Sequence, residues 1–181
     1  MVMGCRTVAT ELERCVLGFI AQEQPCTAYV VRKRLGESLS SYWSSSAGSI
    51  YPLFERLEQR KWILAKEEAF GTRMLKRYRV SASGRRQLER WLSGPVSRQA
   101  AAHTYDPLRT PVFFLEMVGV EQRRGYLEDA RRETEANLAR HRDDLEEVRQ
   151  NASPYEILGR EGAIGELEAR LRWIGRGLEA L

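Results

Sequence analysis

The 181-residue sequence lacks any long hydrophobic run. No apolar stretch approaches the roughly 18 residues that a membrane-spanning helix requires, and the N-terminal segment MVMGCRTVATELER lacks the apolar region of a signal peptide. Hydrophobic residues make up 43% of the chain and charged residues 30%, which is typical of globular proteins. The composition therefore predicts a cytoplasmic protein with no membrane partner.

Histidine and cysteine are scarce, and this argues against catalysis and metal binding. The two histidines, His103 and His141, form no H-x-x-x-H pair, the cysteines form no C-x-x-C pair, and the chain has no P-loop. Ser49 has no nearby histidine that could activate it as a nucleophile. We therefore expect no enzyme activity, no catalytic residue, no metal site and no cofactor. The odd number of cysteines is typical of reduced thiols in a cytoplasm.

Positive charge is concentrated in the first half of the chain. Residues 1–94 contain 16 Lys and Arg against 9 Asp and Glu, whereas residues 95–181 contain 13 against 16. A basic half beside a mildly acidic half favours a polyanionic partner for the basic half. A charge of this size is also compatible with a role in solubility alone, so the decision rests on the motifs.

The first 94 residues predict three helices, a β-hairpin and a fourth helix. Helical spacing of apolar residues predicts helices over 11–22 and 28–35 and a third that ends near Arg60. Apolar residues then alternate from residue 62 and again in RMLKRYRV, with the Gly71-Thr72 turn between them. Three short helices followed by a two-stranded wing form the winged variant of the helix-turn-helix, so the fold class expected is mainly α.

The third helix begins with the segment SSSAGSIYPLFERLEQR, residues 44–60. Glycine and a proline inside a helix both cost helix stability, so packing alone does not explain Gly48 and Pro52. Small residues let a helix start come close to DNA, where hydroxyls, free amides and the helix dipole bind phosphate. Basic residues near the hairpin tip either contact DNA or form a solvated edge that prevents aggregation. The residues expected to contact DNA are Ser46, Gly48, Ser49, Tyr51 and Arg56, with Gly71, Thr72, Arg73, Lys76 and Arg77 of the wing.

Residues 95–110 have the composition of a linker. Their sequence is PVSRQAAAHTYDPLRT, a stretch of 16 residues. It divides the chain into an expected DNA-binding domain, residues 1–94, and an expected helical dimerisation domain, residues 111–181. The segment PVFFLEMVGV that follows the linker predicts a short helix after Pro111.

Two long helices are predicted beyond the linker, from Glu121 to about Asn151 and from Pro154 onward. Their apolar stripes fit an antiparallel helical hairpin but are too narrow to form a complete core. A second copy of the chain would complete that core, so we expect a homodimer. The residues expected at the dimer interface are Leu138, Leu145, Ile164, Leu167, Leu171, Ile174 and Leu178.

The segments YWSSSAGSIYPLFERLEQRKWI and KRYRVSASGRRQLERWL resemble the PadR family of bacterial transcriptional regulators. The family pattern is a Gly-Ser/Thr-Ile/Leu-Tyr-Pro step that opens the recognition helix, then Arg-Leu-Glu, a wing ending in Tyr-Arg-Leu-Thr, and a helix opened by Gly. The family usually has Gly after the recognition helix, where this chain has Lys61, which a positive φ would strain. The C-terminal helix also resembles the dimerisation helix of longer members. The matching motifs are Gly48-Ser49-Ile50-Tyr51-Pro52, Arg56-Leu57-Glu58, Tyr78-Arg79-Val80-Ser81 and Gly84.

The resemblance implies a homodimeric repressor that binds double-stranded DNA at an inverted-repeat operator and releases it when a small molecule acts on the dimer. Some relatives respond to phenolic acids and others to planar cationic drugs. A pocket for a small aromatic effector would use aromatic side chains, although aromatics beside a linker are also typical of domain-packing core. The candidates are Trp91, Tyr105, Phe113, Phe114, Tyr126 and Trp173.

A second interpretation is a winged-helix and coiled-coil adaptor that binds another protein and does not read DNA. The two interpretations differ in salt dependence, because DNA binding weakens steeply with salt whereas an apolar protein interface barely responds. The basic first half favours DNA.

Overall fold

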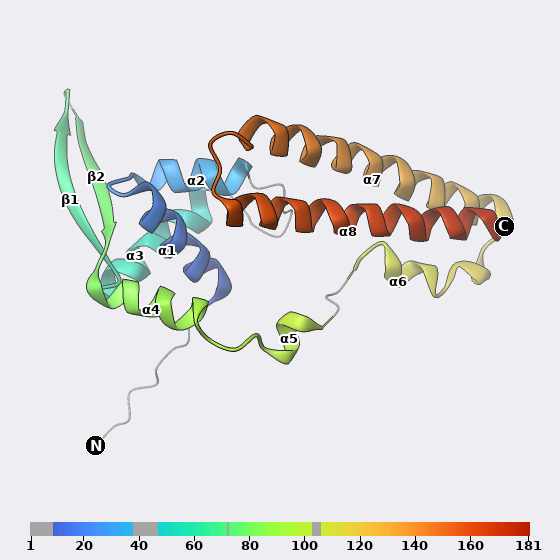
Figure 1. The fold of residues 1–181 in the computed structure, drawn as a ribbon, viewed down its shortest axis with the longest axis horizontal. Helices are drawn as coiled ribbons and strands as arrows, with labels where there is room; N and C mark the ends of the chain where they lie inside the picture. The colour runs from blue at the N-terminus through green and yellow to red at the C-terminus, as the bar shows by residue number, and fades with distance from the viewer. Residues whose placement is uncertain (1–8, 38–46, 72, 103–105) are drawn as a thin grey trace, which may run out of the picture. The chain divides into compact units, whose positions relative to one another are not determined.

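The computed structural model describes residues 9–37, 47–71, 73–102 and 106–181, and it divides the chain into two compact units (Figure 1). The first unit is Met1–Ser97 and the second is Arg98–Leu181. The first has the element order helix, helix, helix, hairpin, helix, and the second is helical. The expected fold class, mainly α with a winged helix-turn-helix, is confirmed.

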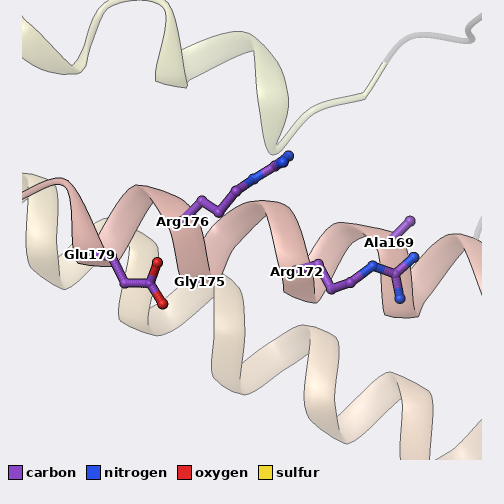
Figure 2. Close-up of a pocket in the computed structure, with 5 residues that line it drawn as sticks. All are labelled: Ala169, Arg172, Gly175, Arg176 and Glu179. Atoms are coloured by element: carbon purple, nitrogen blue, oxygen red, sulfur yellow. The ribbon is translucent and has the colours of Figure 1, made fainter.

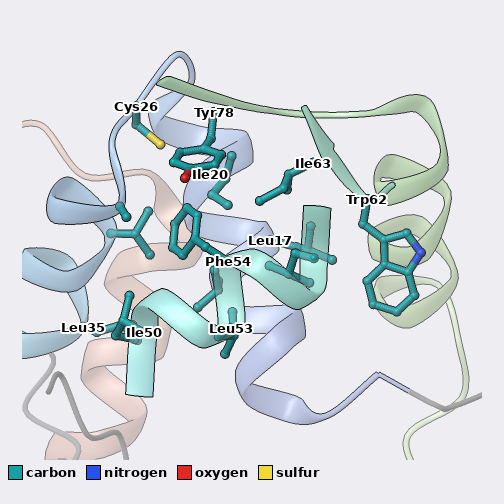
Figure 3. Packing of buried hydrophobic residues seen from close by; sticks show 14 of the residues in the cluster. Leu17, Ile20, Cys26, Leu35, Ile50, Leu53, Phe54, Trp62, Ile63 and Tyr78 are labelled. Carbon is teal, nitrogen blue, oxygen red and sulfur yellow. The ribbon is translucent and has the colours of Figure 1, made fainter. Parts of the chain in front are cut away.

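Three helices open the first unit: α1 (Glu11–Glu23), α2 (Ala28–Glu37) and α3 (Ala47–Gln59). The expected capping box starts α1, because the Thr10 hydroxyl accepts from the amide of Glu13 at 3.2 Å and the Glu13 carboxylate accepts from the amide of Thr10 at 2.9 Å. The Thr27 hydroxyl accepts from the amide of Val30 at the start of α2. The three helices bury their apolar faces in one core, with Leu17, Leu35 and Phe54 among its fully buried side chains (Figure 3).

The wing consists of β1 (Ile63–Phe70) and β2 (Arg73–Val80), paired antiparallel with Phe70 opposite Arg73. Gly71 in the two-residue turn has a φ of 60°, a left-handed conformation that glycine adopts without steric cost. Tyr78 anchors the wing, because its ring meets the Phe54 ring edge-on at 4.7 Å and its backbone pairs with that of Cys26. Figure 3 shows Tyr78 over the core beside Cys26 and Ile20.

The turn from α3 into β1 passes through Lys61, whose φ is 55°. The start of α4 (Ala82–Leu92) holds this turn, since the hydroxyls of Ser81 and Ser83 donate to the Lys61 carbonyl at 2.6 and 2.5 Å. Gly84 lies so close to this turn that a Cβ there would lie 2.1 Å from the Trp62 carbonyl oxygen. Glycine at position 84 is therefore required by close approach.

The start of the second unit differs from the expectation. It contains one helical turn, α5 (Arg98–Ala101), a second, α6 (Arg109–Val112), and a 3-10 turn, η1 (Leu115–Met117). The predicted helix after Pro111 is wrong, because α6 ends at Val112 and no α-helix forms until Val120. The chain here packs on the long helices through Leu108, Val112 and Leu115, and this packing replaces a regular helix.

Two long helices, α7 (Val120–Val148) and α8 (Pro154–Glu179), form the predicted antiparallel hairpin. Leu127 near the start of α7 reaches Gly177 near the end of α8, and Arg142 pairs with Glu168 at 2.7 Å. Ser153 caps α8 and Pro154 occupies its first position, as expected. The buried stripe of α7 consists of Leu127, Ala130, Thr134, Leu138 and Leu145.

Within the described ranges, no helix combines the length and the apolar character that crossing a membrane needs.

Candidate nucleic-acid interface

The recognition helix α3 has one buried face and one exposed face. Ile50, Leu53, Phe54 and Leu57 face the core at helical spacing. The opposite side of the helix is accessible and chemically mixed, and the Tyr51 side chain on it is 50% exposed. From Ser49 onward, where the structure describes the side chains, the exposed residues of α3 are Tyr51, Pro52, Glu55, Arg56 and Gln59.

The start of α3 carries the predicted contact residues only in part. Ser46 lies outside the described residues, and the helix begins at Ala47, so Gly48 falls in its first turn. Pro52 has no N–H, so the Gly48 carbonyl four residues earlier has no helical donor. Ser49 is half-buried and already interacts within the chain. The exposed Tyr51 is therefore the predicted contact residue that this turn presents most openly.

Arg56 is held by a carboxylate from another helix. Its Nε lies 3.6 Å from Oε1 of Glu13, whose side chain is only 2% exposed, while the Arg56 side chain remains 49% exposed. Arg60 Nη1 donates to Oε2 of the same carboxylate at 3.0 Å. Two guanidinium groups around one carboxylate leave the cluster with a net positive charge at the edge of the exposed face.

The predicted wing cations also have acidic neighbours. Lys76 Nζ lies 3.7 Å from Glu58 of α3, and Arg77 Nε lies 3.0 Å from Glu68 of β1. Arg77 further donates to the Pro25 carbonyl at 3.3 Å. The side chains of these pairs are 28–50% exposed, so solvent weakens the pairs and DNA phosphates can compete for these cations. Thr72 lies outside the described residues, and of Arg73 the structure describes the backbone only.

The sequence analysis did not identify Lys66 and Arg79 of the wing, or the carboxylate of Glu13 in α1, as residues of the candidate interface. Pairing in β1 and β2 places Lys66 opposite Arg77 and Leu64 opposite Arg79, so Lys66, Arg77 and Arg79 share one face of the wing. Strand alternation was the signal for Arg79, because it stands two residues after Arg77. No sequence signal indicated that Glu13, read as a capping residue, also meets α3.

Tyr78 contributes to the position of the wing and is not a reactive group. Burial first, and then the carboxylates of Glu58 and Glu55 with the nearby Tyr51, raise the pKa of Tyr78 to about 12.

Burial also raises the pKa of the Cys15 and Cys26 thiols, which keeps them protonated and unreactive. Within the described ranges, no cluster of three or more His, Cys, Asp or Glu could hold a metal.

The predicted effector residues are distributed over both units. Trp91 of α4 lies under Arg14, with the guanidinium carbon 5.9 Å from its ring centroid, and Tyr105 lies outside the described residues. In the second unit, Tyr126 and Trp173 pack against the same buried cluster, and the Tyr126 hydroxyl donates to the Leu108 carbonyl at 2.7 Å. Burial and then Asp106 raise the pKa of Tyr126. Phe113 and Phe114 are exposed.

An open hollow lies along one side of α8 and contains none of those aromatic residues (Figure 2). Its lining consists of small and charged residues and includes no aromatic side chain that could stack on an aromatic ligand. The residues that line it are Ala169, Arg172, Gly175, Arg176 and Glu179.

The predicted dimerisation residues divide into two groups by burial. Leu138, Leu145 and Ile174 are already buried within one protomer. The remaining four are half-buried on α8 and keep accessible surface. They are Ile164, Leu167, Leu171 and Leu178.

Comparison with known proteins supports the motif-based interpretation. Residues 16–90, from α1 through α4, match the Transcriptional regulator PadR-like family. The negative transcriptional regulator PadR of Bacillus subtilis (strain 168) is 22% identical over 148 residues, which cover 81% of this chain and 79% of that relative.

Two crystal structures share the fold. Bacillus subtilis PadR in complex with operator DNA matches with a TM-score of 0.80 at 19% identity, covering 94% of this chain and 97% of that chain. Bacillus subtilis PadR in complex with p-coumaric acid matches with a TM-score of 0.76 at 19% identity, covering 93% and 97%. At this identity the two structures establish the fold alone. The winged-helix motifs and the curated relative agree with the family match, which assigns residues 16–90 of this chain to the Transcriptional regulator PadR-like family.

Proposed function

We propose that the protein is a homodimeric repressor that binds a specific DNA operator through α3 and the wing. The observation that carries this proposal is the exposed side of α3 beside a basic wing, in a fold that Bacillus subtilis PadR uses in a complex with operator DNA. Residues 1–94 serve as the DNA-binding domain, 95–110 as the linker and 111–181 as the dimerisation domain. Such a repressor works in the bacterial cytoplasm and needs no enzyme activity.

The start of α3 and the wing divide the work of binding. The start of α3, with Gly48 and Ser49 in the helix and Ser46 preceding it in the sequence, offers hydroxyls, amides and the positive end of the helix dipole to phosphates. Tyr51 and Arg56 reach the groove from the exposed side of the helix. The turn residues Gly71 and Thr72 bring the hairpin close to DNA, where Arg73, Lys76 and Arg77 bind phosphates or enter a minor groove.

A homodimer matches a two-fold symmetric operator. The half-buried stripe of α8 supports dimerisation, because a second copy would cover surface that the hairpin leaves accessible. Two winged-helix units related by a two-fold axis read an inverted repeat, with half-site centres about 34 Å apart or a multiple of that spacing.

A small aromatic effector releases the DNA in this proposal. Bacillus subtilis PadR forms a complex with p-coumaric acid, and this chain has six aromatic candidates for a comparable role. Titrating p-coumaric acid into a preformed protein–DNA complex tests one member of this chemical class. Weakened DNA binding supports an aromatic carboxylate as effector, and an unchanged affinity removes p-coumaric acid from the candidates.

Selection of bound sequences from random duplex DNA, repeated at four salt concentrations, tests the proposal. Enrichment of a palindrome together with a steep loss of affinity between about 50 and 200 mM salt is the expected result. Recovery of no motif would contradict a sequence-specific repressor. A flat salt dependence would then favour the adaptor that binds another protein.

A further inference from the structure

We propose that Glu13 is a positioning residue for DNA recognition: its buried carboxylate holds Arg56 so that the guanidinium group faces the operator. This inference rests on the proposed DNA-binding function. Glu13 belongs to α1, on which no DNA contact is expected, and it stands 47 positions before Arg60 in the chain.

The Glu13 carboxylate is shared between its own helix cap and α3. Oε2 accepts from the Thr10 amide at 2.9 Å and from Arg60 Nη1 at 3.0 Å, while Oε1 faces Arg56 Nε at 3.6 Å. The capping box fixes the carboxylate relative to the α1 backbone, so Arg60 is hydrogen-bonded to a rigid carboxylate and Arg56 is ion-paired with the same group. A surface ion pair would lack this rigidity.

The two arginines have different surroundings and hence different roles. Arg60 is turned inward, with its side chain 26% exposed and its guanidinium carbon 4.9 Å from the centroid of the Trp62 ring. Arg56 remains 49% exposed and faces Glu13 through Nε. Because a guanidinium has five N–H donors and Arg56 faces Glu13 through Nε, we assign its two terminal nitrogens to a second, bidentate partner.

Arg56 lies on the same side of α3 as Ser49, the predicted phosphate contact at the start of that helix. Ser49 and Arg56 are seven residues apart, so they lie on the same side of the helix, two turns from each other. Arginine that pairs with guanine does so through such a terminal fork. Glu13 thus removes part of the rotamer freedom that Arg56 would otherwise lose on binding.

Glu13→Gln separates positioning from simple electrostatics. Removing a negative charge strengthens binding to any DNA, so electrostatics alone predicts equal or tighter binding to a random duplex and no loss of preference for the operator. Positioning instead predicts that the ratio of operator affinity to random-duplex affinity falls, by roughly 3- to 10-fold for one immobilised long side chain. Glu11→Gln is the matched control, because it removes the same charge from an exposed residue in the same helical turn.

The experiment measures Kd for the selected operator and for a random duplex of equal length, at fixed salt, for the wild-type protein and both variants. A lower ratio in Glu13→Gln with an unchanged ratio in Glu11→Gln is the expected result. An unchanged ratio in Glu13→Gln, or an equal fall in both affinities, overturns the positioning role. A wild-type protein that prefers no duplex removes the proposed function itself, and this inference with it.

Two further variants keep the test decisive if Glu13→Gln unfolds. Glu13→Asp keeps the buried charge but withdraws the carboxylate from Arg56 by one methylene group, and the same fall in the ratio is expected with the random-duplex affinity unchanged. In a double-mutant cycle with Arg56→Lys, which keeps the positive charge, Glu13→Asp should cause no further fall. Additive effects in that cycle would show that Glu13 does not act through Arg56.

Discussion

The two units differ in how completely they bury their apolar side chains. The winged-helix unit closes a core to which α1, α2, α3, the wing and α4 all contribute. In the described part of the second unit, the corresponding cluster is built on Leu127, Ala130 and Ile174, and most of the α8 stripe remains half-buried. Since burial of apolar surface must offset the conformational entropy of folding, we infer that the first unit is stable alone and that the second depends on a partner.

Phe54→Ala gives the largest expected effect, because it tests the closed core of the first unit. Phe54 is fully buried in α3 and meets the Tyr78 ring, so its truncation leaves a cavity between the recognition helix and the wing. The unfolding free energy of the first unit should fall by about 3–5 kcal/mol. Urea titration followed by circular dichroism measures this change.

The same variant also tests whether the units are independent. If they are, the α7–α8 hairpin of Phe54→Ala unfolds at the same urea concentration as in the wild type. A parallel loss of stability in the hairpin would break the comparison between the units.

Leu167→Glu tests the open core of the second unit. Leu167 is half-buried on α8, so a carboxylate there can reach solvent in one protomer but not in an interface covered by a second copy. We expect the dissociation constant of the dimer to rise about 30-fold, which corresponds to a loss of about 2 kcal/mol of dimerisation free energy. Sedimentation equilibrium measures it.

Ala169→Glu is the control for this dimer prediction, since it adds the same negative charge at an exposed position of α8 and leaves the stripe intact. Equal dissociation in both variants would assign the effect to charge. An unchanged dimer in Leu167→Glu would place the interface elsewhere.

Local patterns predicted most of the fold. The capping box at Thr10, the Gly71-Thr72 turn and the Ser153-Pro154 start all specify structure through neighbouring residues, and each element appears where the sequence placed it. The prediction for residues 111–120 is wrong, because the apolar residues there predict a helix whereas packing of Leu108, Val112 and Leu115 on the long helices decides the conformation. Tertiary packing of this kind leaves no periodic signal in the sequence.

The sequence predicted which residues form the candidate interface but not which other residues of the chain hold them in place. Motifs located α3 and the wing, and strand alternation could have added Arg79. The contact of Glu13 with Arg56 and Arg60 joins residues more than 40 positions apart, and no spacing rule connects them. Long-range ion pairs depend on how helices pack, which the sequence pattern of either helix does not specify.

The environment of His141 predicts that mild acid destabilises the second unit and leaves the first unit unaffected. Burial first, and then Arg140 and Arg160, lower the pKa of His141 below its ordinary value of 6.5. Since the unfolded chain binds the proton more tightly, the stabilising contribution is present above pH 6.5 and is lost as the pH falls through and below that value. The winged-helix unit contains no histidine, so this loss should be confined to the second unit.

His141→Gln is the variant that tests this origin, since it removes the titrating group. Thermal unfolding at pH 7 and pH 5.5 should show a smaller difference for the second unit in His141→Gln than in the wild type. An equal difference in both proteins would assign the acid sensitivity to other groups.

Lys61→Gly should raise the stability of the first unit slightly and leave the second unchanged. Lys61 has a φ of 55°, where a side chain is strained and glycine is not, and the hydroxyls of Ser81 and Ser83 hold its carbonyl in place. Release of this strain, less the greater entropy of glycine in the unfolded chain, predicts a gain of about 0.5–1 kcal/mol in urea unfolding. Lys61→Ala is the matched control, because it removes the same charge and keeps a Cβ in the left-handed conformation. An equal gain in both variants would assign the effect to the lysine charge, whereas a gain in Lys61→Gly alone would show that the left-handed conformation at position 61 strains the wild-type winged-helix unit.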